Sequence, residues 1–297
     1  MMESWIFFAL AATVFQTARF MLQKVLATTG LSAGGATFSR FVYAAPIVWG
    51  GVLIFLPDLP EMGSDFWPFA ISGGISQILA TVCVVLLFQT RNFAVGITLK
   101  KTEVLLTVLV GIIILGEGVS WAGFGAMVIG VFGVLLLSDP PQVGQGGLRG
   151  LIKNRAVVLG LTSGIFFGIS AVTYRGATLE IAADPAIRAL VTLACVLAVQ
   201  VLTLGLWLLI REPGEIGRVG RAWTRAGWIG LTSLGGSFCW FMAFTLENAG
   251  IVFALGQVEV ILSLFASVLI FHEKVTPREM IGIALITLSV VVLIAVT

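Results

Sequence analysis

The sequence predicts an all-α integral membrane protein, in which ten transmembrane helices form two inverted five-helix repeats around a central cavity. Of its 297 residues, 58% are hydrophobic and only 11% are charged, whereas an ordinary soluble domain has about 25% charged residues. The mean hydropathy is +1.07. Ten apolar segments approach the length of roughly 20 residues that a helix needs to cross the hydrocarbon core. The two halves of the chain also align with each other without a gap.

The most polar connection, residues 139–154, is rich in Pro, Gly and Gln and lies close to the middle of the chain. It separates five predicted spans from five others. The first repeat therefore covers residues 1–138, the linker 139–154, and the second repeat 155–297. The predicted spans are residues 4–27, 32–56, 66–89, 95–116, 119–138, 155–179, 185–210, 223–246, 250–271 and 275–296.

The internal repeat is clearest between residues 91–137 and 247–293, which lie 156 positions apart. Matches of Leu, Val and Ile alone could reflect shared composition, so the matched charged residues carry more weight. These are Glu103 with Glu259, Glu117 with Glu273, and Arg19 with Arg175. An odd number of spans per repeat inverts the second copy relative to the first, an arrangement typical of alternating-access transporters.

Eleven of the 17 Lys and Arg residues lie in connections or at the adjoining ends of the predicted spans, and all eleven fall at odd-numbered connections. They are Lys24, Arg91, Arg149, Lys153, Arg155, Arg211, Arg218, Arg221, Arg225, Lys274 and Arg278. The even-numbered connections have acids instead, namely Asp58, Glu61, Asp65, Glu117 and Glu247. By the positive-inside rule, the odd connections are cytoplasmic and both termini lie outside.

Charged residues within predicted spans are candidates for the substrate site, because a charge inside the membrane is costly unless it faces a cavity or a partner. The candidates are Arg19, Arg40, Lys100, Lys101, Arg175, Arg188, Glu103 and Glu259. The alternative is that they extend to the interface from helix ends, or form internal ion pairs that only order the bundle. Polar and aromatic residues that could line the same cavity are Gln257, Tyr43, Tyr174 and Trp240.

Lys100 and Glu103 are three positions apart, so on a helix they are close enough to pair. Lys101 is rotated about 200° from Glu103 and needs another partner unless the backbone unwinds. The balance of charge around a central cavity would then be positive, which suits a carboxylate, a phosphate or a zwitterion.

The two repeated glutamates are candidates for coupling transport to protons. Glu259 has Gly256 at the position equivalent to Lys100, so we expect Glu259 to be the acid that protonates more readily. The alternative is that both glutamates bond to neighbouring helices and that the carrier is an uncoupled exchanger. Glu117 and Glu273, in the turns GEGVS and HEKVT, are interpreted as solvated turn or cap residues.

Two five-span repeats, each with a glutamate turn (LGEGVS and FHEKVT) before a final span, resemble the EamA-type transporters of the drug/metabolite transporter superfamily. This resemblance implies a basket of ten helices around a cavity that opens alternately to each side. Where many relatives have a proline after the acid of the fourth and ninth spans, this chain has Val104 and Val260. We therefore expect no proline-broken helix at these positions.

These observations predict a secondary transporter in a bacterial inner membrane, exporting or exchanging a small anionic or zwitterionic metabolite such as an amino acid. The alternative is a carrier or partner subunit for an anionic lipid headgroup or a sugar phosphate. No catalytic motif, metal-ligand spacing or nucleotide-binding loop is found in the sequence, so we expect no enzymatic activity, cofactor or metal. The expected partners are a small-molecule substrate, the lipid bilayer and protons as a candidate coupling ion. We expect no nucleic acid, and a monomer or homodimer.

Overall fold

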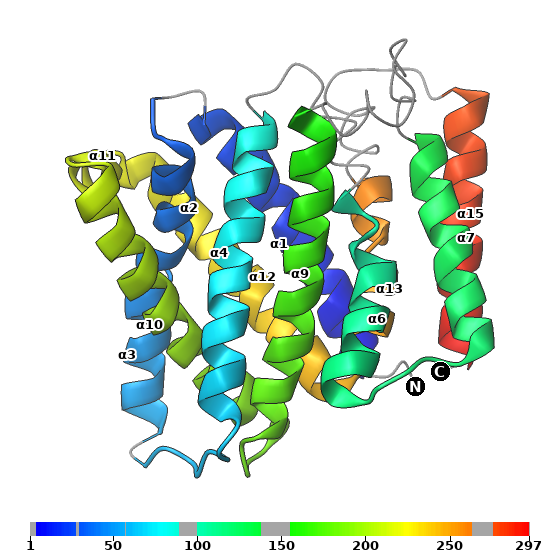
Figure 1. Ribbon diagram of the computed structural model, residues 1–297, viewed down its shortest axis with the longest axis horizontal. Coiled ribbons are helices and arrows are strands. Elements are labelled where there is room, and N and C mark those ends of the chain that lie inside the picture. The colour runs from blue at the N-terminus through cyan, green and yellow to red at the C-terminus, as the bar shows by residue number, and fades with distance from the viewer. Residues whose placement is uncertain are drawn as a thin grey trace.

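The computed structural model describes residues 4–27, 30–56, 58–88, 100–137, 155–262 and 276–296, and within these ranges the regular structure is helical. Figure 1 shows an upright bundle in which both chain termini lie at the lower end. The helices of the first half are α1 (Ser4–Ala27), α2 (Ala33–Val42), α3 (Ala45–Phe55), α4 (Phe66–Phe88), α6 (Glu103–Leu115) and α7 (Trp121–Leu137). Those of the second half are α9 (Arg155–Leu179), α10 (Pro185–Arg211), α11 (Glu215–Arg221), α12 (Trp223–Leu246), α13 (Ala249–Leu255) and α15 (Pro277–Val296).

The observed helices follow the predicted spans closely, and α1, α9 and α12 have the predicted bounds. Six helical segments are long and apolar enough to cross a membrane, namely Ala33–Phe55, Phe66–Leu87, Arg155–Leu179, Pro185–Arg211, Ala226–Leu246 and Pro277–Val296. Shorter apolar helices occupy Glu103–Leu115, Trp121–Leu137 and Ala249–Leu262. An all-α membrane fold therefore fits the chain. The total of ten spans stays a prediction, because parts of the fourth and ninth predicted spans lie outside the described residues.

The second predicted span is two helices rather than one, since α2 and α3 are separated by a turn at Tyr43 and Ala44. Pro46 lies in the first turn of α3. Proline lacks a backbone N–H and fits the first turn of a helix better than its interior, so it favours a new helix start here. A second difference is α11, a short helix within a segment that we predicted only as a connection.

Contacts between the two halves hold the bundle together. Helix α4 packs along α9, α1 along α12, and α7 along α15. The repeat alignment makes α1 equivalent to α9 and α4 equivalent to α12, so the first two contacts correspond to each other. At the third, Gly133 of α7 and Gly282 of α15 let the backbones approach, because a Cβ on either would lie 2.8 Å from the carbonyl oxygen of the other.

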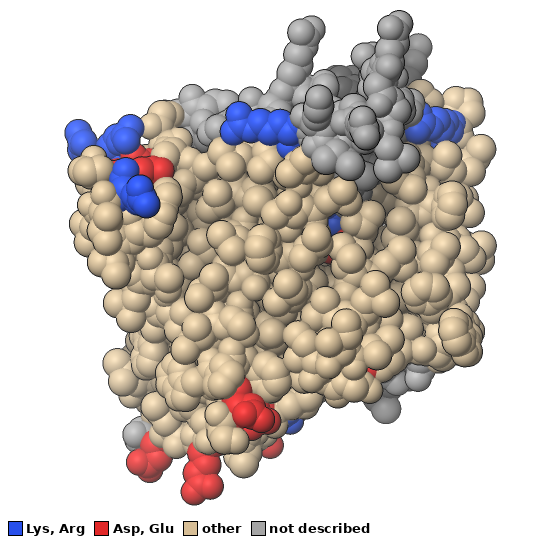
Figure 2. Space-filling view, in the orientation of Figure 1, with Lys and Arg blue, Asp and Glu red and all other residues tan. Residues whose placement is uncertain are grey.

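Charge is divided between the two ends of the bundle. Figure 2 shows Lys and Arg gathered mainly at the end that carries α11, and Asp and Glu mainly at the opposite end. The wall between them is almost entirely uncharged on this face. This distribution agrees with the predicted separation of basic and acidic connections. Six of the eleven predicted basic residues, Lys24, Arg91, Arg149, Lys153, Arg225 and Lys274, have side chains outside the described part.

Candidate substrate site

Both repeated glutamates lie in the first turn of a helix that follows a two-residue turn. Glu103 begins α6 directly after the turn at Lys101 and Thr102. Glu259 follows a turn at Gly256 and Gln257, where the backbone N–H of Glu259 donates to the Gly256 carbonyl at 3.1 Å, a tightened i to i+3 bond. Turns therefore interrupt the helix before both glutamates, although neither position has a proline. A carboxylate in a first helical turn is favoured by the helix dipole.

The turn before α6 places two buried lysines against two different carboxylates. Lys100 Nζ lies 3.0 Å from Glu103 Oε1, which is the predicted pair. Lys101 Nζ lies 2.6 Å from Glu259 Oε2, so the second lysine pairs with the other half of the chain. Close packing supports this geometry, since a Cβ on Gly164 of α9 would lie 2.9 Å from the Lys100 carbonyl oxygen.

This contact corrects our expectation for Glu259. The sequence argument assumed that Glu259 lacks a cation because Gly256 replaces the lysine of the first repeat. Instead, Glu259 Oε2 accepts hydrogen bonds from Lys101 and, at 2.9 Å, from Gln16 Nε2 of α1. A nearby cation favours the ionised carboxylate, so the structure removes the reason for singling out Glu259 as the acid that protonates more readily.

Gln16 of α1 connects this ion-pair cluster to a neighbouring cavity. Its Nε2 donates to Glu259, while its Oε1 accepts from Arg19 Nη2 at 3.3 Å and from Trp240 Nε1 at 3.1 Å. The side-chain amide of Gln16 therefore has a defined orientation. Its nitrogen faces the Glu259 carboxylate, and its oxygen faces the donors of Arg19 and Trp240. Arg19 is buried inside the bundle.

Arg40 of α2 is a buried cation without a carboxylate partner among the described residues. It is only 3% exposed. Its Nη1 donates to Thr81 Oγ1 at 3.1 Å and its Nη2 to Ser237 Oγ at 3.4 Å, while the buried Nε has no hydrogen-bond partner. Burying an unpaired charge costs several kcal/mol, so such a residue suggests a ligand.

A cavity lies beside Arg40 and is lined from both halves of the chain. Its accessible volume is about 20 Å³, which is roughly the room that a single water molecule needs. An adjoining smaller cavity is lined by Arg19 and again by Arg40. The lining residues of the larger cavity are Gln16, Arg40, Gln77, Phe167, Ser170, Tyr174, Ser237, Trp240, Phe241, Phe244 and Phe253.

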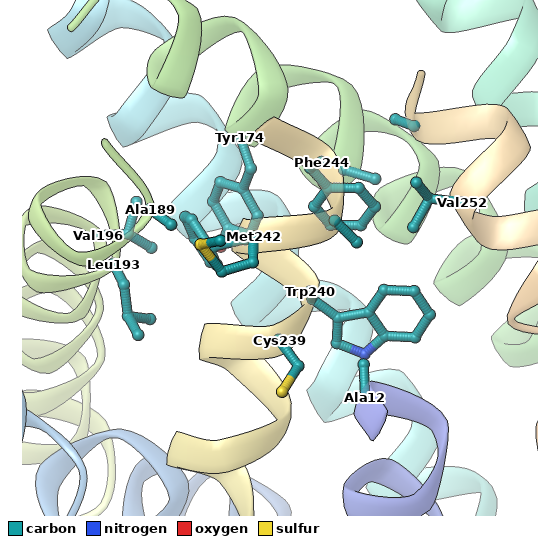
Figure 3. Packing of buried hydrophobic residues seen from close by; sticks show 14 of the residues in the cluster. Ala12, Tyr174, Ala189, Leu193, Val196, Cys239, Trp240, Met242, Phe244 and Val252 are labelled. Carbon is teal, nitrogen blue, oxygen red and sulfur yellow. The ribbon is translucent and has the colours of Figure 1, made fainter. Parts of the chain in front are cut away.

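Aromatic rings form much of the cavity wall. Trp240 and Phe244 of α12 stack with centroids 5.6 Å apart, and Phe253 of α13 meets both edge-on at 5.4 Å. Tyr174 of α9 stacks on Phe241 at 4.5 Å. Figure 3 shows the Trp240 indole extending from α12 toward Ala12 of α1. Phe244 lies above the indole in this view, and Tyr174 lies to the left of Phe244. The site thus has an apolar wall next to one buried guanidinium.

Several predicted site residues lie away from this cavity. Tyr43 sits at the turn between α2 and α3, where its hydroxyl donates to the Val219 carbonyl of α11 at 2.9 Å. Gln257 is buried against Gly130 of α7 instead, since a Cβ on Gly130 would lie 2.8 Å from its Oε1. Neither residue lines the two cavities described above. Lys100 and Lys101 do not line them either, because both ammonium groups turn to their carboxylates.

Arg175 lies at the acidic end of the bundle and joins three elements there. Its Nε donates to Glu117 at 2.5 Å, and its Nη1 donates to the carbonyls of Phe244 and Glu247 at 2.8 and 2.7 Å. Glu117 is thus an ion-pair partner rather than the solvated turn residue that we expected. Nearby, Arg188 donates to the Thr178 carbonyl at 2.7 Å. Glu273 lies outside the described residues.

Sequence reasoning missed three glutamines. Besides Gln16, Gln77 of α4 accepts at Oε1 from Tyr174 Oη at 3.1 Å and from Gln200 Nε2 of α10 at 2.8 Å. The Tyr174 hydroxyl in turn accepts from Gln200 at 3.1 Å. Uncharged amides within apolar spans were the available signal, because a polar group in the membrane interior needs a partner or a cavity.

The second half of the chain, residues 154–295, matches the model of the EamA-like transporter family. The predicted resemblance is thereby confirmed for the EamA-like half, which contributes α9 to α15 and most of the aromatic cavity wall. This match indicates a membrane transporter of the drug/metabolite transporter superfamily as the general class of protein.

The chain is also similar to solved structures, one of which is described as "Crystal structure of protein". The likeness has a TM-score of 0.72 and covers 98% of this chain and 96% of that chain, at 15% sequence identity. At that identity the likeness concerns the fold alone, and it extends beyond the EamA-like half to the first half. No curated protein matches the chain.

Proposed function

We propose that the protein is a secondary active transporter that exports or exchanges a small anionic or zwitterionic metabolite across a bacterial inner membrane. The observation that carries this proposal is Arg40, a buried guanidinium that has no carboxylate partner among the described residues and faces a cavity between the two halves. An anion entering the cavity would supply the missing charge.

The balance of charge around the site supports an anionic ligand. Four buried cations, Arg19, Arg40, Lys100 and Lys101, stand against two buried carboxylates, Glu103 and Glu259. The lysines are matched by the two carboxylates, whereas Arg40, which lines both cavities, has no carboxylate partner among the described residues.

Alternating access is supported by the equivalence of contacts under the repeat. Helix α4 packs on α9 as α12 packs on α1, and the cavity is lined by α1, α2 and α4 from one half and by α9, α12 and α13 from the other. Rocking of two inverted repeats around such a site would expose it to each side in turn.

The alternative of a carrier for a lipid headgroup receives less support. It requires a side opening that exposes Arg19 or Lys100 to lipid, and these residues are 3% and 2% exposed.

Counterflow into proteoliposomes tests the proposal. We expect saturable, exchange-stimulated uptake of at least one radiolabelled probe among pyruvate, 3-phenylpropionate, L-leucine and L-glutamate. Arg40→Gln should reduce that uptake about tenfold or more, since a hydrogen bond to a charged group contributes roughly 1.5–3 kcal/mol. Arg211→Gln, which removes an exposed arginine at the end of α10, is the matched control and should transport normally. Equal uptake by wild type and Arg40→Gln would contradict the assignment.

A further inference from the structure

We propose that the substrate is a monocarboxylate with an apolar body and without an ammonium group. This inference rests on the proposed transport function and narrows its substrate class. It is drawn from the hydrogen-bonding capacity that the cavity leaves unused.

The amide acceptors in the cavity wall are already occupied. Gln16 Oε1 accepts two hydrogen bonds, from Arg19 and Trp240. Gln77 Oε1 also accepts two, from Tyr174 and Gln200. Because a carbonyl oxygen has two lone pairs, neither amide has an acceptor site left for a ligand ammonium.

The two buried carboxylates of the protein are likewise unavailable to a ligand. Glu103 and Glu259 are each held by a lysine, and neither is among the residues that line the two cavities. An ammonium group would have to give up its hydration without an ionic partner in the described wall, which is costly. The cavity therefore disfavours an amine or an amino acid.

Arg40, in contrast, has hydrogen-bond donors that a ligand could use. Its Nε–H is buried without a partner, and its two terminal nitrogens rest on neutral hydroxyls, Thr81 and Ser237. A carboxylate is a stronger acceptor than a hydroxyl and matches the planar guanidinium, so it would satisfy these donors better.

The rest of the wall suits an apolar body. Trp240, Phe244 and Phe253 form one contiguous aromatic cluster, and Tyr174 with Phe241 forms another. Apolar surface buried against these rings adds affinity that a highly hydrated polyanion or sugar phosphate could not gain.

Thermal unfolding of the purified protein with a matched set of probes tests this inference. The probes are 3-phenylpropionate, L-phenylalanine, phenethylamine, acetate and inorganic phosphate. We expect 3-phenylpropionate to raise the Tm by about 3 °C or more at saturation, because a ligand that binds the folded state stabilises it. Half-maximal stabilisation by L-phenylalanine or acetate should need at least about tenfold more probe, a difference of roughly 1.4 kcal/mol. Phenethylamine and phosphate should give no shift.

Variants then place the binding in this cavity. Arg40→Gln should abolish the shift with 3-phenylpropionate, Arg40→Lys should retain part of it, and Arg211→Gln should leave it unchanged. Phe253→Ala should weaken the response to 3-phenylpropionate while leaving Arg40 in place. This variant and Arg40→Lys keep the test decisive if Arg40→Gln does not fold.

The two proposals fail in distinguishable ways. Tighter binding of L-phenylalanine or phosphate than of 3-phenylpropionate would overturn the substrate class, and saturable uptake of either would leave the transport function standing. Stabilisation by 3-phenylpropionate without exchange-stimulated uptake of any probe would instead support the binding chemistry and contradict transport.

Discussion

The ion pair between Lys101 and Glu259 should be a strong link between the two halves, and a double-mutant cycle can test it. Lys101→Met removes the cation and leaves the buried carboxylate with the amide of Gln16 as its remaining donor. Glu259→Gln leaves the buried ammonium without its anion. Lys101→Met combined with Glu259→Gln leaves two neutral groups, and the new glutamine can still accept from Gln16.

Breaking one partner of a buried ion pair costs about 3–5 kcal/mol, whereas replacing both is often close to neutral. At about 2–4 °C per kcal/mol, each single variant should lower the Tm by roughly 6–20 °C. The double variant should unfold at a higher temperature than either single variant. Tryptophan fluorescence of the detergent-purified protein can follow unfolding, because the chain has eight tryptophans.

The exposed substitution Arg211→Met provides the baseline and should change stability by less than about 0.5 kcal/mol. If the two single losses simply add in the double variant, Lys101 and Glu259 do not depend on each other. Such additivity would refute the reasoning from the buried pair.

Two further outcomes are expected. A reporter fused after Thr297 should be periplasmic and one inserted in the 211–221 connection should be cytoplasmic, because the basic connections should face the cytoplasm. Fusions to alkaline phosphatase and to green fluorescent protein measure this, and the opposite pattern would reverse the orientation. Arg175→Gln should lower stability by about 2–3 kcal/mol, since it removes the donor that Glu117 and two carbonyls at the end of α12 share. Thermal unfolding measures this loss, and a Tm equal to that of wild type would mean that the contacts contribute nothing.

The helices of the bundle were largely predictable, because apolar length and short polar connections are local properties of the chain. The break between α2 and α3 could also have been inferred from Pro46, but an apolar segment of the right length suggested one helix. The interruption before Glu103 was less accessible, as no proline accompanies it.

The arrangement of the site was harder to predict, because it depends on packing between segments that are distant in the sequence. Spacing along one helix predicted the pair of Lys100 with Glu103, since both residues lie three positions apart. The partner of Lys101 could not be predicted in the same way, because Glu259 reaches it only when α9, α13 and the turn before α6 come together. Aromatic residues were similarly ambiguous: Tyr174 and Trp240 line the cavity, whereas Tyr43 bonds to α11.

The positive charge of Arg40, which has no carboxylate partner among the described residues, has an electrical consequence. Each elementary charge carried across a membrane potential of 100 mV changes the free energy by about 2.3 kcal/mol. A bound monoanion would offset the charge of Arg40, so loaded and empty carriers would reorient under different electrical forces. The empty form, with more buried charge to move through the bilayer, is the less favoured one to reorient. Under the proposed transport function, such a site would link the return of the carrier to the binding of a second anion and would favour one-for-one exchange.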